Sequence, residues 1–96
     1  MQIQISAINK IDRAIGETKS LMAVDKDPLF PAFLIELTRY RSLVESQWPL
    51  DRSQKDSVDI GRVAMRELDE SYPDYVSTLC KLGSFLREED GNEESA

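Results

Sequence analysis

The feature that most constrains this chain is the spacing of its apolar residues, which recur every three or four positions. This spacing is typical of amphipathic helices, whereas strict alternation would indicate strands. Four segments carry it, at about residues 6–22, 31–47, 54–69 and 71–86, and none of the four alternates. Because short connections favour antiparallel neighbours, the sequence predicts an all-α fold, a compact antiparallel bundle of three to four helices.

Each expected helix has one apolar face that should turn inward. Gly61 and Gly83 lie within two of these faces. A glycine costs up to ~1 kcal/mol in helix propensity, so we expect close helix–helix approach to compensate. Arg41 also lies among apolar residues, and we expect it to extend to solvent or to pair with a nearby carboxylate. The residues expected to face inward are Ala7, Ile8, Ile11, Ala14, Ile15, Thr18, Leu21 and Met22; Phe30, Phe33, Leu34, Leu37, Tyr40, Val44 and Trp48; Val58, Ile60, Gly61, Ala64, Met65 and Leu68; and Tyr72, Tyr75, Val76, Leu79, Leu82, Gly83 and Leu86.

The ends of the expected helices carry local signals. Residues 23–31 hold two prolines and two aspartates, which is typical of a loop. Ser53 and Asp56 have the spacing of a capping box at the start of the third helix, with aspartate in place of the usual glutamate or glutamine. Ser71 is the expected N-cap of the fourth helix, and Pro73 suits its first turn because proline needs no N–H acceptor there.

The length of 96 residues predicts one domain, over residues 1–88, followed by an acidic and disordered tail over residues 89–96. The net charge of −6 lies entirely in the second half of the chain. Residues 1–50 hold six basic and six acidic residues, whereas residues 51–96 hold six basic and twelve acidic ones. This balance excludes nucleic acid binding by phosphate neutralisation and favours a basic protein partner.

The residue types needed for most catalytic sites are missing. The chain has no histidine, which is the commonest general base and metal ligand. Cys80 lies beside an apolar face, so we expect it at the edge of the core and not as a nucleophile. The four glycines are scattered and form no phosphate-binding loop. We therefore expect no enzymatic activity, no cofactor and no metal ion.

The sequence also indicates a compartment. No apolar run approaches the ~18 residues that a membrane-spanning helix needs, and the first residues lack the profile of a secretory signal. A single cysteine cannot form an internal disulfide, which suits a reducing environment. We expect a cytoplasmic protein that does not bind membranes.

One arc of the expected third helix stands out as a candidate surface. At about 100° per residue, Asp56, Asp59, Val63, Glu67 and Glu70 would share one side of a helix over residues 54–69 and its end. Four carboxylates would then surround one apolar residue. Such a face is either solvated surface or a site where the apolar anchor and its acidic ring meet a basic patch on a partner.

Three stretches resemble a known family. They are Ile11–Ala14 (IDRA), Leu50–Ser53 (LDRS) and Val63–Asp74 (VAMRELDESYPD), of which the third is the most specific. They are similar to bacterial immunity proteins that act against type VI secretion effectors whose toxin domain is an NAD(P)+ glycohydrolase. The similarity covers most of residues 8–80, and the acidic tail and the loop at 25–31 depart from the family pattern.

The resemblance implies a helical fold and a mode of action. An immunity protein of this kind binds its cognate toxin domain and occludes the pocket where the dinucleotide would be hydrolysed. The resemblance carries Arg66, Glu67, Asp69 and Glu70 over as matched positions. Together with the arc, it predicts a partner-binding site that comprises Asp56, Asp59, Val63, Arg66, Glu67 and Glu70.

The alternative is a helical adaptor or secretion chaperone that binds a basic protein partner, because the same size and acidity would suit it. An acidic mimic of nucleic acid ranks last, because it would need carboxylates spaced regularly over a longer face. The sequence leaves open whether the chain forms homo-oligomers and which toxin would be the partner.

Overall fold

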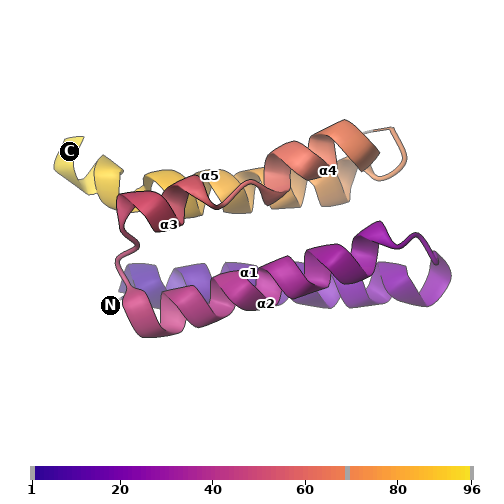
Figure 1. Cartoon of the computed structure of the whole chain (residues 1–96), viewed down its shortest axis with the longest axis horizontal. Coiled ribbons are helices and arrows are strands. Elements are labelled where there is room, and N and C mark those ends of the chain that lie inside the picture. The colour runs from indigo at the N-terminus through magenta and orange to yellow at the C-terminus, as the bar shows by residue number, and fades with distance from the viewer. Residues whose placement is uncertain (1, 69, 96) are drawn as a thin grey trace. The chain divides into compact units, whose positions relative to one another are not determined.

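The computed structural model describes residues 2–68 and 70–95, with side chains described for residues 3–68 and 70–87. The regular structure of these residues is entirely helical (Figure 1), so the all-α prediction is confirmed. Contacts divide the chain into two compact units, Met1–Trp48 and Pro49–Ala96, and each is described by itself. The prediction of a single domain over residues 1–88 stays a prediction. The helices are α1 (Gln2–Val24), α2 (Leu29–Gln47), α3 (Arg52–Asp56), α4 (Ile60–Leu68) and α5 (Pro73–Ser95).

The first unit is a hairpin of two long antiparallel helices, α1 and α2 (Figure 1). At its open end the side-chain amide of Gln4 donates to the carbonyl oxygen of Val44 at 2.8 Å. At its closed end two aspartates organise the loop: Asp25 Oδ1 accepts from the N–H of Asp27, and Asp27 Oδ1 accepts from the N–H of Leu29, both at 2.9 Å. Aspartate side chains that bond the backbone two residues on are typical of such turns, and here they start α2.

The loop of this hairpin is shorter than the sequence predicts. Ala23 and Val24 belong to α1, and α2 begins at Leu29, two residues before Pro31. Pro31 lies in the first turn of α2, where backbone N–H groups have no acceptor within the helix, so its missing N–H costs nothing. The loop prediction over residues 23–31 was therefore wrong at both ends, and the place of Pro31 in the first turn explains the second.

The buried face of α1 is narrower than the predicted one. Its fully buried residues are spaced four, three and four positions apart, whereas Ile8 and Ile15, which were expected to face inward, are half-buried. The hydroxyl of Thr18 donates to the carbonyl oxygen of Ala14 at 2.7 Å, so its burial leaves no unpaired donor. In α2 the predicted face is confirmed at five positions, with Leu34 and Trp48 half-buried. The fully buried residues of the two helices are Ala7, Ile11, Ala14 and Thr18 in α1, and Phe30, Phe33, Leu37, Tyr40 and Val44 in α2.

In the second unit α3 and α4 both pack on α5, which runs antiparallel to them (Figure 1). α4 approaches α5 closely at Gly61, where a Cβ atom would come within 2.9 Å of Cα of Cys80. The close approach expected at Gly61 is therefore confirmed. At Gly83 the nearest such atom, the backbone nitrogen of Gly61, would lie at an ordinary 3.9 Å. The thiol of Cys80 is half-buried, at the edge of the core as expected, and donates to the carbonyl oxygen of Gly61 at 3.5 Å.

The single third helix predicted over residues 54–69 is wrong, because the chain leaves the helix after Asp56 and re-enters one at Ile60. Val58 and Ile60 are both 1% exposed. In one continuous helix residues two positions apart point to opposite sides, so only one of the two could be buried. The break lets both enter the core. The hydroxyl of Ser57 closes the end of α3 by donating to the carbonyl oxygen of Gln54 at 2.7 Å.

The caps of the second unit also differ from the prediction. The N-cap of α3 is Asp51 and not Ser53: Asp51 Oδ1 accepts from the N–H of Gln54, and Gln54 Oε1 accepts from the N–H of Asp51, both at 2.8 Å. Glutamine is long enough to reach back in this way, whereas the predicted pair would have needed the shorter aspartate to do so. Pro73 lies in the first turn of α5, as predicted, but it is the first residue of the helix, so Ser71 lies one residue too early to cap it.

The core of the second unit follows the predicted apolar faces with two exceptions. Met65 is 51% exposed, because the separate register of α4 turns it outward. Tyr72 is half-buried. The tail predicted over residues 89–96 lies outside the described side chains. The buried residues are Leu50, Val58, Ile60, Gly61, Ala64, Leu68, Tyr75, Val76, Leu79, Leu82, Gly83 and Leu86.

Candidate partner-binding surface

The structure distributes the six predicted site residues over two helices and two connections. Asp56 is the last residue of α3, and Asp59 lies between α3 and α4. Glu70 is exposed in the turn after α4. The continuous acidic arc is therefore not present, since the helix that would have carried it is divided. The remaining three residues, Val63, Arg66 and Glu67, lie within α4.

The outer side of α4 is formed by a charged pair beside one partly covered apolar residue. Arg66 Nε lies 3.2 Å from Glu67 Oε2, and the two side chains are 70% and 43% exposed. An ion pair this exposed adds at most ~1 kcal/mol to stability, so both groups stay available to a partner. Val63 is half-buried, and its N–H donates to the carbonyl oxygen of Asp59 at 3.2 Å. Asp69, matched by the family resemblance, lies outside the described residues.

A shallow groove beside this side of α4 exposes an apolar anchor that the sequence reasoning missed. Met65 stands at a cavity of about 130 Å³ where Gly61 and Gly83 contribute no side chains. Methionine adapts its shape to different surfaces and is enriched where proteins meet. The sequence does hold one signal for this exposure. Val58 and Ile60 are apolar residues two positions apart, which cannot both face the core in one helix, so a break before α4 could have been predicted. The residues lining the groove are Val58, Asp59, Gly61, Arg62, Met65, Cys80, Gly83, Ser84 and Arg87.

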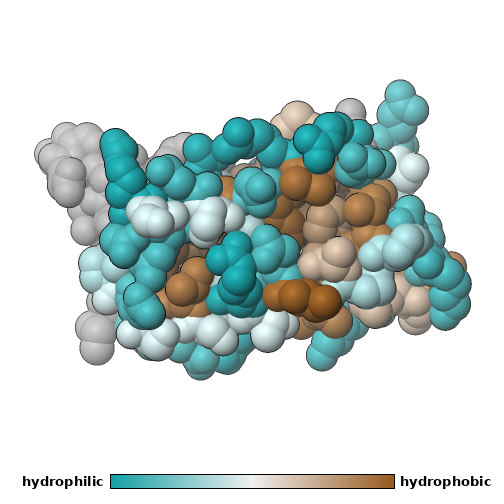
Figure 2. Space-filling view, in the orientation of Figure 1, coloured by the Kyte–Doolittle hydropathy of each residue, from teal (hydrophilic) through white to brown (hydrophobic). Residues whose placement is uncertain are grey.

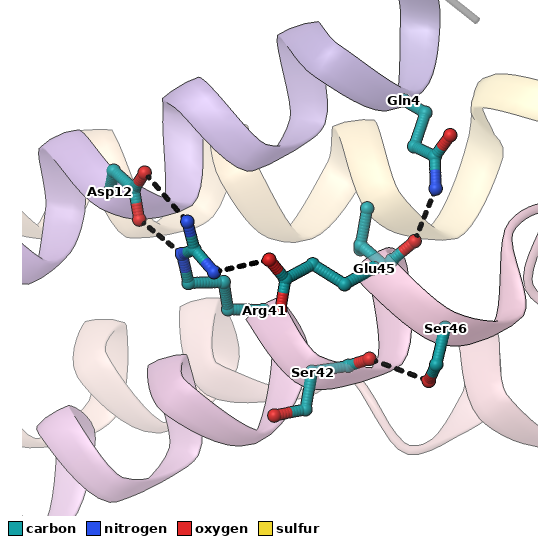
Figure 3. A network of polar contacts seen from close by, with 7 residues as sticks. Gln4, Asp12, Arg41, Ser42, Glu45 and Ser46 are labelled. Carbon is teal, nitrogen blue, oxygen red and sulfur yellow. Dashed lines mark hydrogen bonds and ion pairs between the residues drawn. The ribbon is translucent and has the colours of Figure 1, made fainter.

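In the first unit, a network of charges joins the two helices of the hairpin (Figure 3). Arg41 Nε donates to Asp12 Oδ1 at 2.7 Å, and its Nη1 donates to Glu45 Oε2 at 2.6 Å. Hydrogen bonds to Asp12 and then to Glu45 raise the pKa of Arg41 above its usual value. The expected pairing of Arg41 with a carboxylate is confirmed. The network holds α1 against α2, so we assign it to the fold and not to the site.

The first unit also carries exposed apolar side chains. Ile5, Val24 and Ile35 are 57%, 79% and 71% exposed. They lie at separate places on the hairpin, which is ordinary for single apolar residues on a surface. Figure 2 shows that hydrophilic side chains cover most of the face in view and that apolar surface lies between them.

The described residues contain neither a metal-ligating cluster nor a membrane-spanning helix. No group of three or more cysteine or acidic side chains in this part of the chain is arranged to hold a metal ion. Within the same residues, no helix is both long and apolar enough to cross a membrane.

The fold and this surface define a class: a small all-α protein of two helical units, with a charged helix face and an adjoining apolar anchor. No family model, no curated protein and no solved structure matches the chain.

Proposed function

We propose that this protein is an immunity protein, which binds a cognate bacterial toxin domain in the cytoplasm and neutralises it by occluding the active site. The observation that carries the proposal is the stretch Val63–Asp74, which resembles immunity proteins against type VI secretion effectors. In this stretch the matched residues Arg66, Glu67 and Glu70 are exposed. A resemblance caused by core packing alone would place its matched residues inside, so their exposure favours a role in binding.

The surface beside α4 supplies the two components that protein interfaces use. Exposed charges, here Glu67 and Glu70, steer a basic partner and set the association rate. An apolar residue that becomes fully desolvated, here Met65, contributes most of the free energy of binding. The resemblance further suggests that the partner hydrolyses NAD+ or NADP+, so that an immunity protein seated over its pocket would block access of the dinucleotide.

Co-expression tests the proposal directly. The toxin is expected to be encoded next to this protein, so the neighbouring upstream gene is expressed in cells with and without it. We expect cells to grow only when this protein is present, and a purified mixture to elute as one complex. Equal death in both cultures would overturn the proposal. Loss of protection when the α4 surface is altered, with the fold retained, separates direct neutralisation from an effect on expression.

The second candidate is a helical adaptor or secretion chaperone. The length of 96 residues and the net charge of −6 suit it equally, because both are also typical of a small acidic protein that binds basic clients. The two functions differ in their partners. A chaperone would hold its client unfolded, whereas an immunity protein binds a folded toxin domain. Circular dichroism of the partner in the purified complex distinguishes them.

A further inference from the structure

A pocket of basic side chains lies in the acidic half of this protein. It has a volume of about 340 Å³ and lies where α3 packs on α5. Arg52 and Lys55 line it from α3 and Arg87 lines it from α5, and Leu50 and Asp56 are the other described residues of its lining. Three of the six basic residues of the second half therefore line one pocket.

The short helix that carries two of these cations is fixed at both ends. The reciprocal hydrogen bonds between Asp51 and Gln54 fix its start, and Ser57 fixes its end. Residues three positions apart share one side of a helix, so Arg52 and Lys55 project together. The cations are thus held near one another before any ligand arrives, which lowers the entropic cost of binding.

Two cations of the pocket have no counter-charge among the described side chains. The described part of the lining holds Arg52, Lys55 and Arg87 beside one carboxylate, that of Asp56. Neither Arg52 nor Arg87 forms an ion pair with any side chain that the structure describes. A guanidinium group pairs with an oxyanion through two parallel hydrogen bonds, so these two residues are suited to carboxylates and phosphates.

We propose that this pocket binds a short acidic segment of the partner protein, with its carboxylates on Arg52 and Arg87 and a backbone N–H donated to Asp56. Two features favour a peptide over a phosphate compound. Asp56 would repel a dianion but can accept an N–H. Among the described lining residues Leu50 is the one apolar side chain, so these residues offer no stacking surface for a nucleobase. This inference adds a second contact to the proposed function. It rests on that function in one respect, which is that the partner is a protein.

The carboxylates of Glu67 and Glu70 and the basic pocket beside α3 would together set specificity. A partner with a basic patch alone satisfies the first surface and leaves Arg52 and Arg87 without a counter-charge. Unpaired charges at an interface reject wrong partners. A cognate partner would therefore present a basic patch and an acidic segment together.

The test uses the full chain and a fluorescent peptide of five glutamates, acetylated and amidated, followed by anisotropy. We expect saturable binding at low salt. Arg52→Glu and Arg87→Glu should each raise the Kd at least about tenfold, because each removes a paired cation and adds a repelling charge. Arg52 is the first residue of α3, where glutamate suits the positive end of the helix, so this variant is expected to fold.

Lys81→Glu is the matched control. It makes the same change in net charge on the exposed side of α5 but lies outside the pocket, and we expect its Kd to change less than about twofold. An equal effect of Lys81→Glu, or no saturable binding by the unaltered chain, would overturn the proposal. The proposal would also be overturned if inorganic phosphate displaced the peptide at matched ionic strength and bound more tightly to the Asp56→Asn variant, because the pocket would then be a phosphate site. The assay contains no toxin, so its failure is distinct from a failure of neutralisation.

Discussion

Gly61 lies so close to Cys80 that a methyl group in place of its hydrogen would come within 2.9 Å of the Cα atom of Cys80. The same methyl group would lie 3.3 Å from the carbonyl oxygen of Leu79. Both are backbone atoms of α5, and neither can turn aside as a flexible side chain would. The absence of a side chain at position 61 therefore sets the distance between α4 and α5.

Gly61→Ala is expected to lower the free energy of unfolding by about 1–3 kcal/mol, because the added methyl group must push the two helices apart. Alanine is the better helix former, so propensity alone predicts the opposite sign. Urea denaturation measures the difference. The control is Gly16→Ala in α1, where no heavy atom lies within 4 Å of the new Cβ, and which should stabilise by about 0.5–1 kcal/mol. If both variants are stabilised, the helices do not approach closely at Gly61.

The cap of α3 gives a second prediction. Asp51→Ala is expected to lower the free energy of unfolding by about 1 kcal/mol, because it removes the acceptor for the N–H of Gln54. Ser53→Ala should change the free energy of unfolding by less than about 0.5 kcal/mol, because Ser53 is exposed and is not the cap. Thermal denaturation of the two variants compares them. A larger loss of stability in Ser53→Ala than in Asp51→Ala would show that Ser53 caps α3, as the sequence predicts.

Much of the fold could be predicted from the sequence because apolar spacing reports helices directly. The inward faces of α2 and α5 follow from this spacing, and so does the close contact at Gly61. The candidate surface could not be predicted as well. Its residues were placed by extending one helical register from Asp56 to Glu70, and the burial of both Val58 and Ile60 breaks that register. The break divides the predicted arc between α3 and α4. Within α4, Glu67 is exposed and Leu68 is buried as predicted, whereas Met65 is exposed and does not belong to the core.

The two sides of α2 give a third prediction. Leu37 is fully buried, so Leu37→Ala is expected to lower the free energy of unfolding by about 2–5 kcal/mol through lost burial and the cavity left behind. Ile35 lies two positions away and is 71% exposed. Ile35→Ala should therefore change the free energy of unfolding by less than about 0.5 kcal/mol. Chemical denaturation of both variants measures the contrast, and similar losses would show that Ile35 is covered in solution.

The network around Arg41 gives a prediction about pH. Its hydrogen bonds raise the pKa of Arg41 in the folded state, so the stability they contribute is fully present below the usual arginine pKa and is lost only as the pH rises through the raised value. Arg41→Gln should therefore lower the urea midpoint by the same amount at each pH from 6 to 9. The chain has no histidine to add a pH dependence in this range. A difference that shrinks between pH 6 and 9 would contradict this assignment.

The charged face of α4 gives the prediction that bears on function. Glu67→Lys replaces an exposed carboxylate by a cation, and we expect it to weaken toxin binding at least about tenfold, mainly through slower association. The loss should shrink as salt is raised, because screening weakens steering between exposed charges. The free energy of unfolding should change by less than about 1 kcal/mol, since the pair with Arg66 is exposed.

Glu17→Lys is the control for this prediction, because Glu17 is an exposed residue of α1 and the substitution changes the net charge equally. Surface plasmon resonance at two salt concentrations gives the association and dissociation rates of both variants. Equal slowing by the two substitutions would mean that net charge and not the α4 face governs the encounter. Unchanged rates in Glu67→Lys would place the toxin interface elsewhere on the protein.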